Sequence, residues 1–178
     1  MDDAQHEGFT LVELLVTLTI AALLAGVAVP AMARFLDNAR LRAATGDLAR
    51  ELVLARSHAY TFRKPIYFNV TVTGAAWCYG WGETPDCDCS SNTRSACLTR
   101  ESDLTREHRQ TSADYPQIRL ILTGRRRTSQ VLRFSPVRGT ATATTLALEN
   151  RDSQARVIVS ILGRVRTCSP DMTGYPPC

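Results

Sequence analysis

The sequence predicts an α+β protein in which one long N-terminal hydrophobic helix packs on an antiparallel two-sheet β domain. Three observations lead to this class. An almost uncharged segment fills residues 9–30, apolar residues then recur at intervals of three and four through residues 31–62, and strand-like alternation begins at Ile66 and continues in short runs to the C-terminus. The sequence therefore divides into a short leader (1–8), two halves of one helix (9–30 and 31–62) and a β domain (63–178).

The first segment has the length and composition of a membrane-spanning helix. Residues 9–29 carry a single charge, at Glu13, and as a helix they would cross a hydrocarbon core of about 30 Å. A carboxylate inside such a segment costs about 2.5–3.5 kcal/mol on insertion scales, so Glu13 calls for a functional explanation. The leader contains acids but neither Lys nor Arg, unlike a secretory signal peptide. We expect a helix that is retained as an anchor.

The second half of the helix is expected to be amphipathic. Its predicted buried face consists of six residues at helical spacing: Leu41, Ala44, Leu48, Leu52, Ala55 and Ala59. A helix from Phe9 to Tyr60 would be roughly 78 Å long at about 1.5 Å per residue. The β domain can bury only its second half, so the first half must lie in lipid or among sister subunits.

Pro65 ends the helical pattern, and a period of two follows. Residues 66–72 alternate apolar and polar, which is typical of a half-buried strand. Five further strands are expected at 76–81, 118–122, 131–134, 144–148 and 156–162. Residues 83–115 lack clear periodicity and are expected to form one long loop held by disulfides.

Six cysteines lie outside the membrane segment, in two groups. Cys168 and Cys178 are expected to pair with each other, and Cys78, Cys87, Cys89 and Cys97 to pair among themselves in an undetermined way. Disulfides persist in the periplasm, where the anchor would place this domain. The one-residue gap in Cys87-Asp-Cys89 does not match usual zinc-ligand spacing. No metal or cofactor is expected, and no catalytic motif predicts an enzyme.

The positive charge is concentrated near the C-terminus. Residues 115–178 contain ten arginines against three acids, in a chain of 178 residues with a formal net charge of +4. This distribution fits either a polyanionic partner or an ordinary solvated surface.

The N-terminal motif Gly8-Phe9-Thr10-Leu11-Val12-Glu13 resembles the processing site of type IV pilins and type II secretion pseudopilins. The resemblance implies that prepilin peptidase cleaves after Gly8 and methylates Phe9. It also implies single-pass anchoring in the inner membrane, with a periplasmic domain, before assembly into a filament at the cell surface. Glu13 would then neutralise the ammonium group of Phe9 on a neighbouring subunit.

Three further segments, 54–59, 134–139 and 157–168, are similar to the GspH/FimT-type family of minor pilins and H-type pseudopilins. The last segment, with its Gly-Arg-x-Arg motif before a cysteine, looks most like the T-type minor pilins. This resemblance implies a DNA receptor for natural transformation, with double-stranded DNA and other pilins as partners. The alternative is a structural minor pilin or pseudopilin at the filament tip that has no ligand of its own.

The Gly163-Arg164-Val165-Arg166 motif also supports phosphate binding on physical grounds. If a strand continued past Gly163, Arg164 and Arg166 would point to one side about 6.6 Å apart, because each residue rises about 3.3 Å. Guanidinium groups bind phosphate through two oxygens, and such contacts are independent of base sequence. Gly163 would permit a turn or a close backbone approach. A second basic run, Arg125, Arg126 and Arg127, is an auxiliary candidate, and solvated arginines guarding an edge strand are the competing interpretation.

Overall fold

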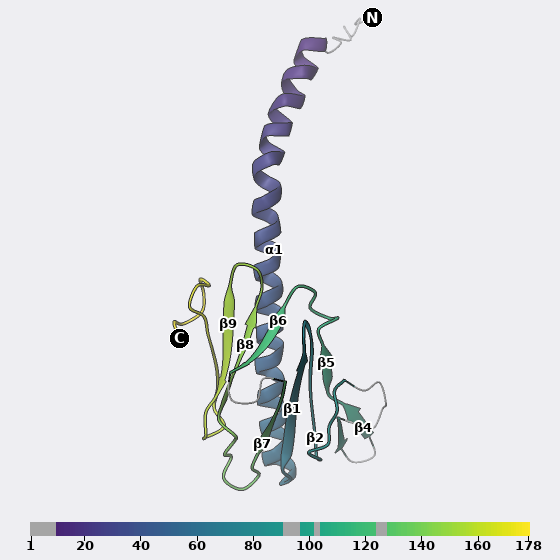
Figure 1. Ribbon diagram of the computed structural model, residues 1–178, viewed down its shortest axis with the longest axis vertical. Helices are drawn as coiled ribbons and strands as arrows, with labels where there is room; N and C mark the ends of the chain where they lie inside the picture. The colour runs from purple at the N-terminus through teal and green to yellow at the C-terminus, as the bar shows by residue number, and fades with distance from the viewer. Residues whose placement is uncertain (1–9, 91–96, 102–103, 124–127) are drawn as a thin grey trace, which may run out of the picture. The chain divides into compact units, whose positions relative to one another are not determined.

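The computed structural model describes residues 10–90, 97–101, 104–123 and 128–178 (Figure 1). The chain divides into two compact units, Met1–Leu36 and Asp37–Cys178. One helix, α1 (Leu11–Phe62), contributes residues to both units. Every strand found among the described residues lies in the second unit.

Helix α1 begins with a capped turn and ends at a left-handed residue. The hydroxyl of Thr10 accepts a hydrogen bond from the backbone N–H of Glu13 at 3.3 Å, which satisfies one of the free donors of the first turn. At the other end Arg63 has φ 52°, a conformation in which the chain leaves the helix before Pro65. Within the described ranges, α1 is the one helix long and apolar enough to cross a membrane by length and composition.

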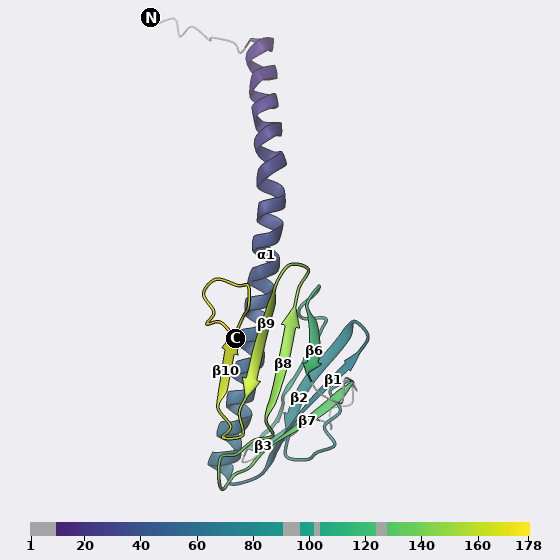
Figure 2. The same ribbon diagram turned by 60° about the vertical axis from the view of Figure 1, so that its left-hand side comes forward.

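Eight strands form two antiparallel sheets (Figures 1 and 2). The first sheet has the order β5-β2-β1-β7, and the second has the order β10-β9-β8-β6. The strands of the first sheet are β1 (Ile66–Thr73), β2 (Ala76–Gly82), β5 (Arg109–Thr111) and β7 (Ser129–Phe134). Those of the second are β6 (Arg119–Thr123), β8 (Thr144–Glu149), β9 (Gln154–Val159) and β10 (Val165–Cys168).

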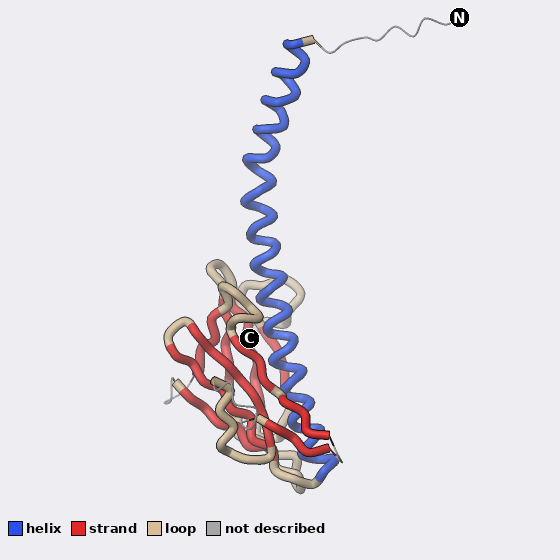
Figure 3. Tube along the Cα trace, turned by 90° about the vertical axis from the view of Figure 1, so that its right-hand side faces the viewer, coloured by secondary structure: helices blue, strands red, loops and turns tan. Residues whose placement is uncertain are grey.

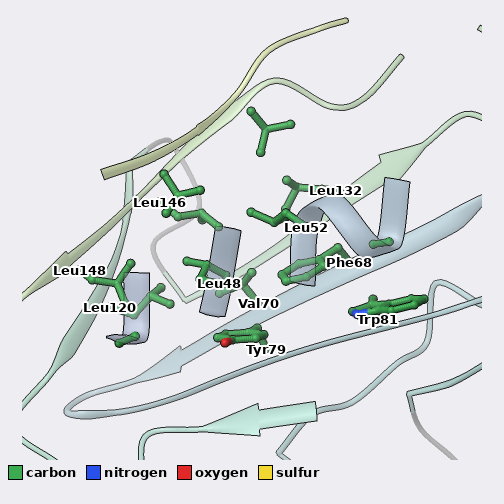
Figure 4. Close-up of a cluster of buried hydrophobic side chains, with 14 of the residues drawn as sticks. Leu48, Leu52, Phe68, Val70, Tyr79, Trp81, Leu120, Leu132, Leu146 and Leu148 are labelled. Carbon is green, nitrogen blue, oxygen red and sulfur yellow. The ribbon is translucent and has the colours of Figure 1, made fainter. Parts of the chain in front are cut away.

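The core joins the second half of α1 to both sheets. All six residues of the predicted helix face are at most 1% exposed, and the part of α1 from Asp37 onward lies along one side of the sheets (Figure 3). Leu48 and Leu52 lie among Phe68 and Leu132 of the first sheet and Leu146 of the second, as Figure 4 shows. The expected α+β class, one long N-terminal helix packed on two antiparallel sheets, is confirmed.

The expectation that residues 83–115 form one long loop held by disulfides needs a correction: the disulfides are present, but the segment also contains strands. This segment contains a two-stranded ribbon, β3 (Leu98–Glu101) and β4 (Leu104–Glu107), and also β5, which adds an edge to the first sheet. The strands have only three or four residues, which is too few for a period of two to be recognised.

Three disulfides hold the domain together, and each forms within one of the two cysteine groups. Cys168 pairs with Cys178 as expected, and the four-cysteine group resolves into Cys78–Cys89 and Cys87–Cys97. The second of these bridges lies against β2, because a Cβ atom added to Gly80 would lie 2.7 Å from Cys97 Sγ. Cys89 is bonded to Cys78 of β2, and the Cys87–Cys97 bridge lies beside that strand, so these cysteines are tied to the first sheet.

Candidate functional site

The Gly-Arg-x-Arg motif forms the connection between β9 and β10. The N–H of Gly163 donates to the Ser160 carbonyl at 2.8 Å, and the N–H of Ser160 donates to the Arg164 carbonyl at 3.0 Å. With φ 69° at Gly163, this is a hairpin turn followed by a bulge in which the glycine is left-handed. A continuous strand over 156–162 and past Gly163 was therefore the wrong expectation, since the turn interrupts it.

The predicted alternation of side chains nevertheless persists beyond the turn. Arg164 and Arg166 are exposed, and Val165 between them is half-buried. Arg166 lies opposite Ile158 in the β9–β10 register, so its position on the sheet is set by backbone pairing. Both guanidinium groups can reach the same side of the hairpin.

Gly163 is a contact point between three distant parts of the sequence. A Cβ atom added to it would overlap the carbonyl oxygen of Gly139 and lie 3.0 Å from Arg56 Nε. The N–H of Ala141 donates to the carbonyl of Ile161 at 3.0 Å, which fixes the β7–β8 loop against the hairpin. Helix α1, the β7–β8 loop and the β9–β10 hairpin thus meet around Gly163.

These three segments contribute four arginines, here called the arginine cluster: Arg56, Arg138, Arg164 and Arg166. All four are exposed. Among the described residues, ion pairs with carboxylates involve Arg40, Arg50, Lys64, Arg119 and His108, and none involves the arginine cluster. The segments 52–66, 133–144 and 154–168 contain neither Asp nor Glu. The cluster therefore presents uncompensated positive charge to solvent.

Sequence reasoning identified Arg164 and Arg166 but not Arg56 and Arg138. Both lie inside family-like segments, 54–59 and 134–139, so the signal was present in the sequence. The sequence alone does not show the tertiary contact that brings these segments to the hairpin. The auxiliary candidates Arg125, Arg126 and Arg127 lie outside the described residues.

The N-terminal candidates are described only in part. Gly8 and Phe9 lie outside the described ranges, whereas Glu13 lies in the first turn of α1 with an exposed side chain.

A cleft of about 490 Å³ lies between α1 and the first sheet. The indole N–H of Trp81 donates to the Glu51 carboxylate at 2.9 Å, and the Trp81 ring stacks on His108 with centroids 3.7 Å apart. These contacts hold α1 against β2. No group of three or more potential metal ligands gathers in the portion of the chain that is described.

Two family models match the sequence. The model of the type II transport protein GspH matches residues 44–163, and the prokaryotic N-terminal methylation motif matches residues 4–29. No curated protein matches the sequence.

The chain is also similar to solved structures of two proteins. The minor pseudopilin EpsH from the type 2 secretion system of Vibrio cholerae matches with a TM-score of 0.51 at 14% identity, over 75% of this chain and 99% of that chain. The type IV minor pilin FimU of Pseudomonas aeruginosa matches with a TM-score of 0.45 at 17% identity, over 74% of this chain and 90% of that chain.

Proposed function

The chain belongs to the GspH family of minor pilins and pseudopilins, and from this premise we propose that it is a minor type IV pilin that binds double-stranded DNA during natural transformation. Its family consists of structural filament subunits. The proposal adds a ligand, duplex DNA, and a place where that ligand binds, the arginine cluster.

The convergence of four unpaired arginines on one fixed hairpin carries the proposal. A planar guanidinium group binds two phosphate oxygens at once, and an arginine without a carboxylate partner has no ion pair to give up when it does so. The hairpin backbone is held by its turn and by the Gly163 contact, so Arg164 and Arg166 project from a rigid base. Phosphate contacts carry no base information, so binding should be independent of sequence.

The N-terminus would deliver the subunit to the filament. We propose that the leader 1–8 is removed after Gly8, that Phe9 is methylated, and that residues 9–30 anchor the chain in the inner membrane with the β domain in the periplasm. The match to the N-terminal methylation motif supports this order of events. After assembly into a pilus at the cell surface, the arginine cluster would be available to extracellular DNA.

DNA binding by the full chain in micelles of a neutral detergent tests the proposal. We expect two duplexes of unrelated sequence to bind within a few-fold of each other, and Arg164→Gln with Arg166→Gln to weaken both strongly. Arg119→Gln is the matched control, because Arg119 lies on the same sheet but is paired with Glu149 at 3.4 Å. Absence of binding by the parent chain at low salt would favour the structural subunit without a ligand.

A further inference from the structure

The turn of the β9–β10 hairpin carries two large aliphatic residues that are unusually exposed. Ile161 is 67% exposed and Leu162 is 70% exposed. Hairpin turns ordinarily use Gly, Asn, Asp, Pro or Ser, which tolerate turn geometry and solvent. Burial of an aliphatic side chain is favourable, so two exposed residues of this kind at a tip can contribute binding energy to a partner that covers them.

This apolar tip is held in place. The Gly163 N–H closes the turn on Ser160, and the Ile161 carbonyl accepts a hydrogen bond from Ala141. Gly163 also lies directly against the Gly139 backbone and the Arg56 side chain. Binding through the tip would consequently require little ordering of the backbone, which favours affinity.

Positive charge lies near the apolar tip. Arg164 follows the tip after Gly163, and the Arg56 side chain lies against Gly163. Arg138 directly precedes Gly139, whose carbonyl oxygen also faces Gly163. Figure 2 shows the hairpin at the same end of the domain as the β7–β8 loop and the C-terminal end of α1. An apolar tip next to several cations, in segments without acids, complements a partner that is anionic outside and apolar inside. Stacked base pairs between two phosphate backbones have this character.

We propose that Ile161 and Leu162 form a wedge that enters the minor groove and partly unstacks one base step, while the arginine cluster holds the phosphates on either side. Apolar wedges of this kind bend the duplex and bring more of its backbone onto the protein. The wedge rests on the proposed DNA-binding function and adds to it a mode of binding. It predicts a preference for duplexes that are easily unstacked, even though no base is read directly.

The test uses the full chain in neutral detergent and a short duplex with donor and acceptor fluorophores at its two ends. Binding of the parent chain should raise energy transfer, because bending shortens the end-to-end distance. It should also favour a duplex with a central mismatch by several-fold. Ile161→Ser with Leu162→Ser should abolish both effects while keeping most of the salt dependence of binding, since the four arginines of the cluster remain.

Two variants control for unrelated effects. Val131→Ser removes an aliphatic side chain that is 42% exposed on β7, and it should bend DNA as the parent does. Ile161→Val with Leu162→Met keeps the tip apolar and should retain the bend. Together they separate loss of the wedge from a general loss of surface hydrophobicity.

The remaining outcomes contradict either the wedge or the proposed DNA-binding function. If the serine variant bends DNA like the parent, or the parent binds without bending or mismatch preference, the wedge is wrong and DNA binding stands. If the serine variant binds and bends DNA normally but is no longer incorporated into filaments, the tip is a docking surface for another subunit, and the wedge is likewise wrong. If the parent binds no DNA, the proposed function itself fails.

Discussion

Gly163 combines two roles that the sequence left as alternatives, a turn and a close backbone approach. Its φ of 69° lies in the left-handed region, and its α-carbon faces the Gly139 carbonyl without room for a side chain. The same residue therefore shapes the hairpin and seats it on the β7–β8 loop. Arg164 owes its position to this contact.

Gly163→Ala should destabilise the domain. The left-handed backbone alone disfavours a non-glycine residue by about 1–2 kcal/mol, and the overlap with Gly139 adds to that penalty. Gly46→Ala is the matched control, because Gly46 lies inside α1 with no atom within 4 Å of an added Cβ, and it should stabilise by about 0.5–1 kcal/mol. Urea unfolding of both variants measures the difference, and equal stabilities would contradict the assigned role of Gly163.

Tyr115 links the β domain to the helix and should make stability sensitive to high pH. Its hydroxyl donates to the Asp47 carboxylate, and burial, with that hydrogen bond, raises the pKa of Tyr115 from 10.0 to about 12. The folded state thus favours the neutral phenol. The free energy of unfolding that Tyr115 contributes is fully present below about pH 10, and it is lost as pH rises toward 12.

Replacing Tyr115 by Phe tests this link. The unfolding free energy of Tyr115→Phe at neutral pH should fall by about 1 kcal/mol, and its decline between pH 10 and pH 12 should be shallower than in the parent. Tyr60→Phe, at a position that is 71% exposed, should leave the alkaline decline unchanged. An identical decline in the Tyr115 variant would refute the role of this tyrosine.

At the scale of elements, the long helix and the longer strands were predictable because their patterns are local and repeat several times. Six residues spaced by three and four predicted the buried face of α1, and all six are buried. Strands β3, β4 and β5 were not predictable, since each has at most four residues and β5 pairs with distant β2. Their existence depends on tertiary pairing and on disulfides whose partners the sequence left open.

The C-terminal tail is held to the domain by a disulfide and by α1. Cys168–Cys178 closes a loop with a sequence separation of 10, and Arg42 donates to the Thr173 carbonyl at 2.6 Å within that loop. Cys168→Ser with Cys178→Ser should lower the unfolding free energy by roughly 2–3 kcal/mol, through entropy returned to the unfolded chain. Mass mapping of a non-reduced digest checks the pairing. A peptide that links Cys168 or Cys178 to any cysteine of the group 78, 87, 89 and 97 would refute it.

At the scale of the whole molecule, half of the arginine cluster proposed as the DNA-binding site could be predicted from the sequence. The spacing of Arg164 and Arg166 is a property of one short segment, so the sequence showed it directly. The contributions of Arg56 and Arg138 depend on three segments meeting at Gly163, separated along the chain by dozens of residues. The apolar tip could not be predicted from the sequence, because it is defined by the exposed fractions of the Ile161 and Leu162 side chains in the folded domain.

Glu13 should act in assembly and not in folding. Glu13→Ala should be cleaved and should leave the β domain intact, because the side chain is exposed in α1. It should enter filaments poorly, since the Phe9 ammonium of a neighbouring subunit would then lack a buried partner. Gly8→Val, in contrast, should block cleavage. The amounts of cleaved and uncleaved protein in membranes and in sheared filaments distinguish a cleavage defect from an assembly defect. Normal incorporation of Glu13→Ala into filaments would contradict the proposed role of Glu13 in assembly.

The salt dependence of DNA binding tests the central claim, binding of duplex DNA through the arginine cluster, most directly. Each phosphate contact contributes about 0.9 to the slope of log affinity against log salt concentration for duplex DNA. For the full chain in neutral detergent, Arg164→Gln with Arg166→Gln should flatten the slope by about 1.8, and adding Arg56→Gln with Arg138→Gln should flatten it further. Arg119→Gln should leave it unchanged, because that arginine is paired with Glu149. A double variant whose slope equals that of the parent would contradict phosphate binding by the cluster.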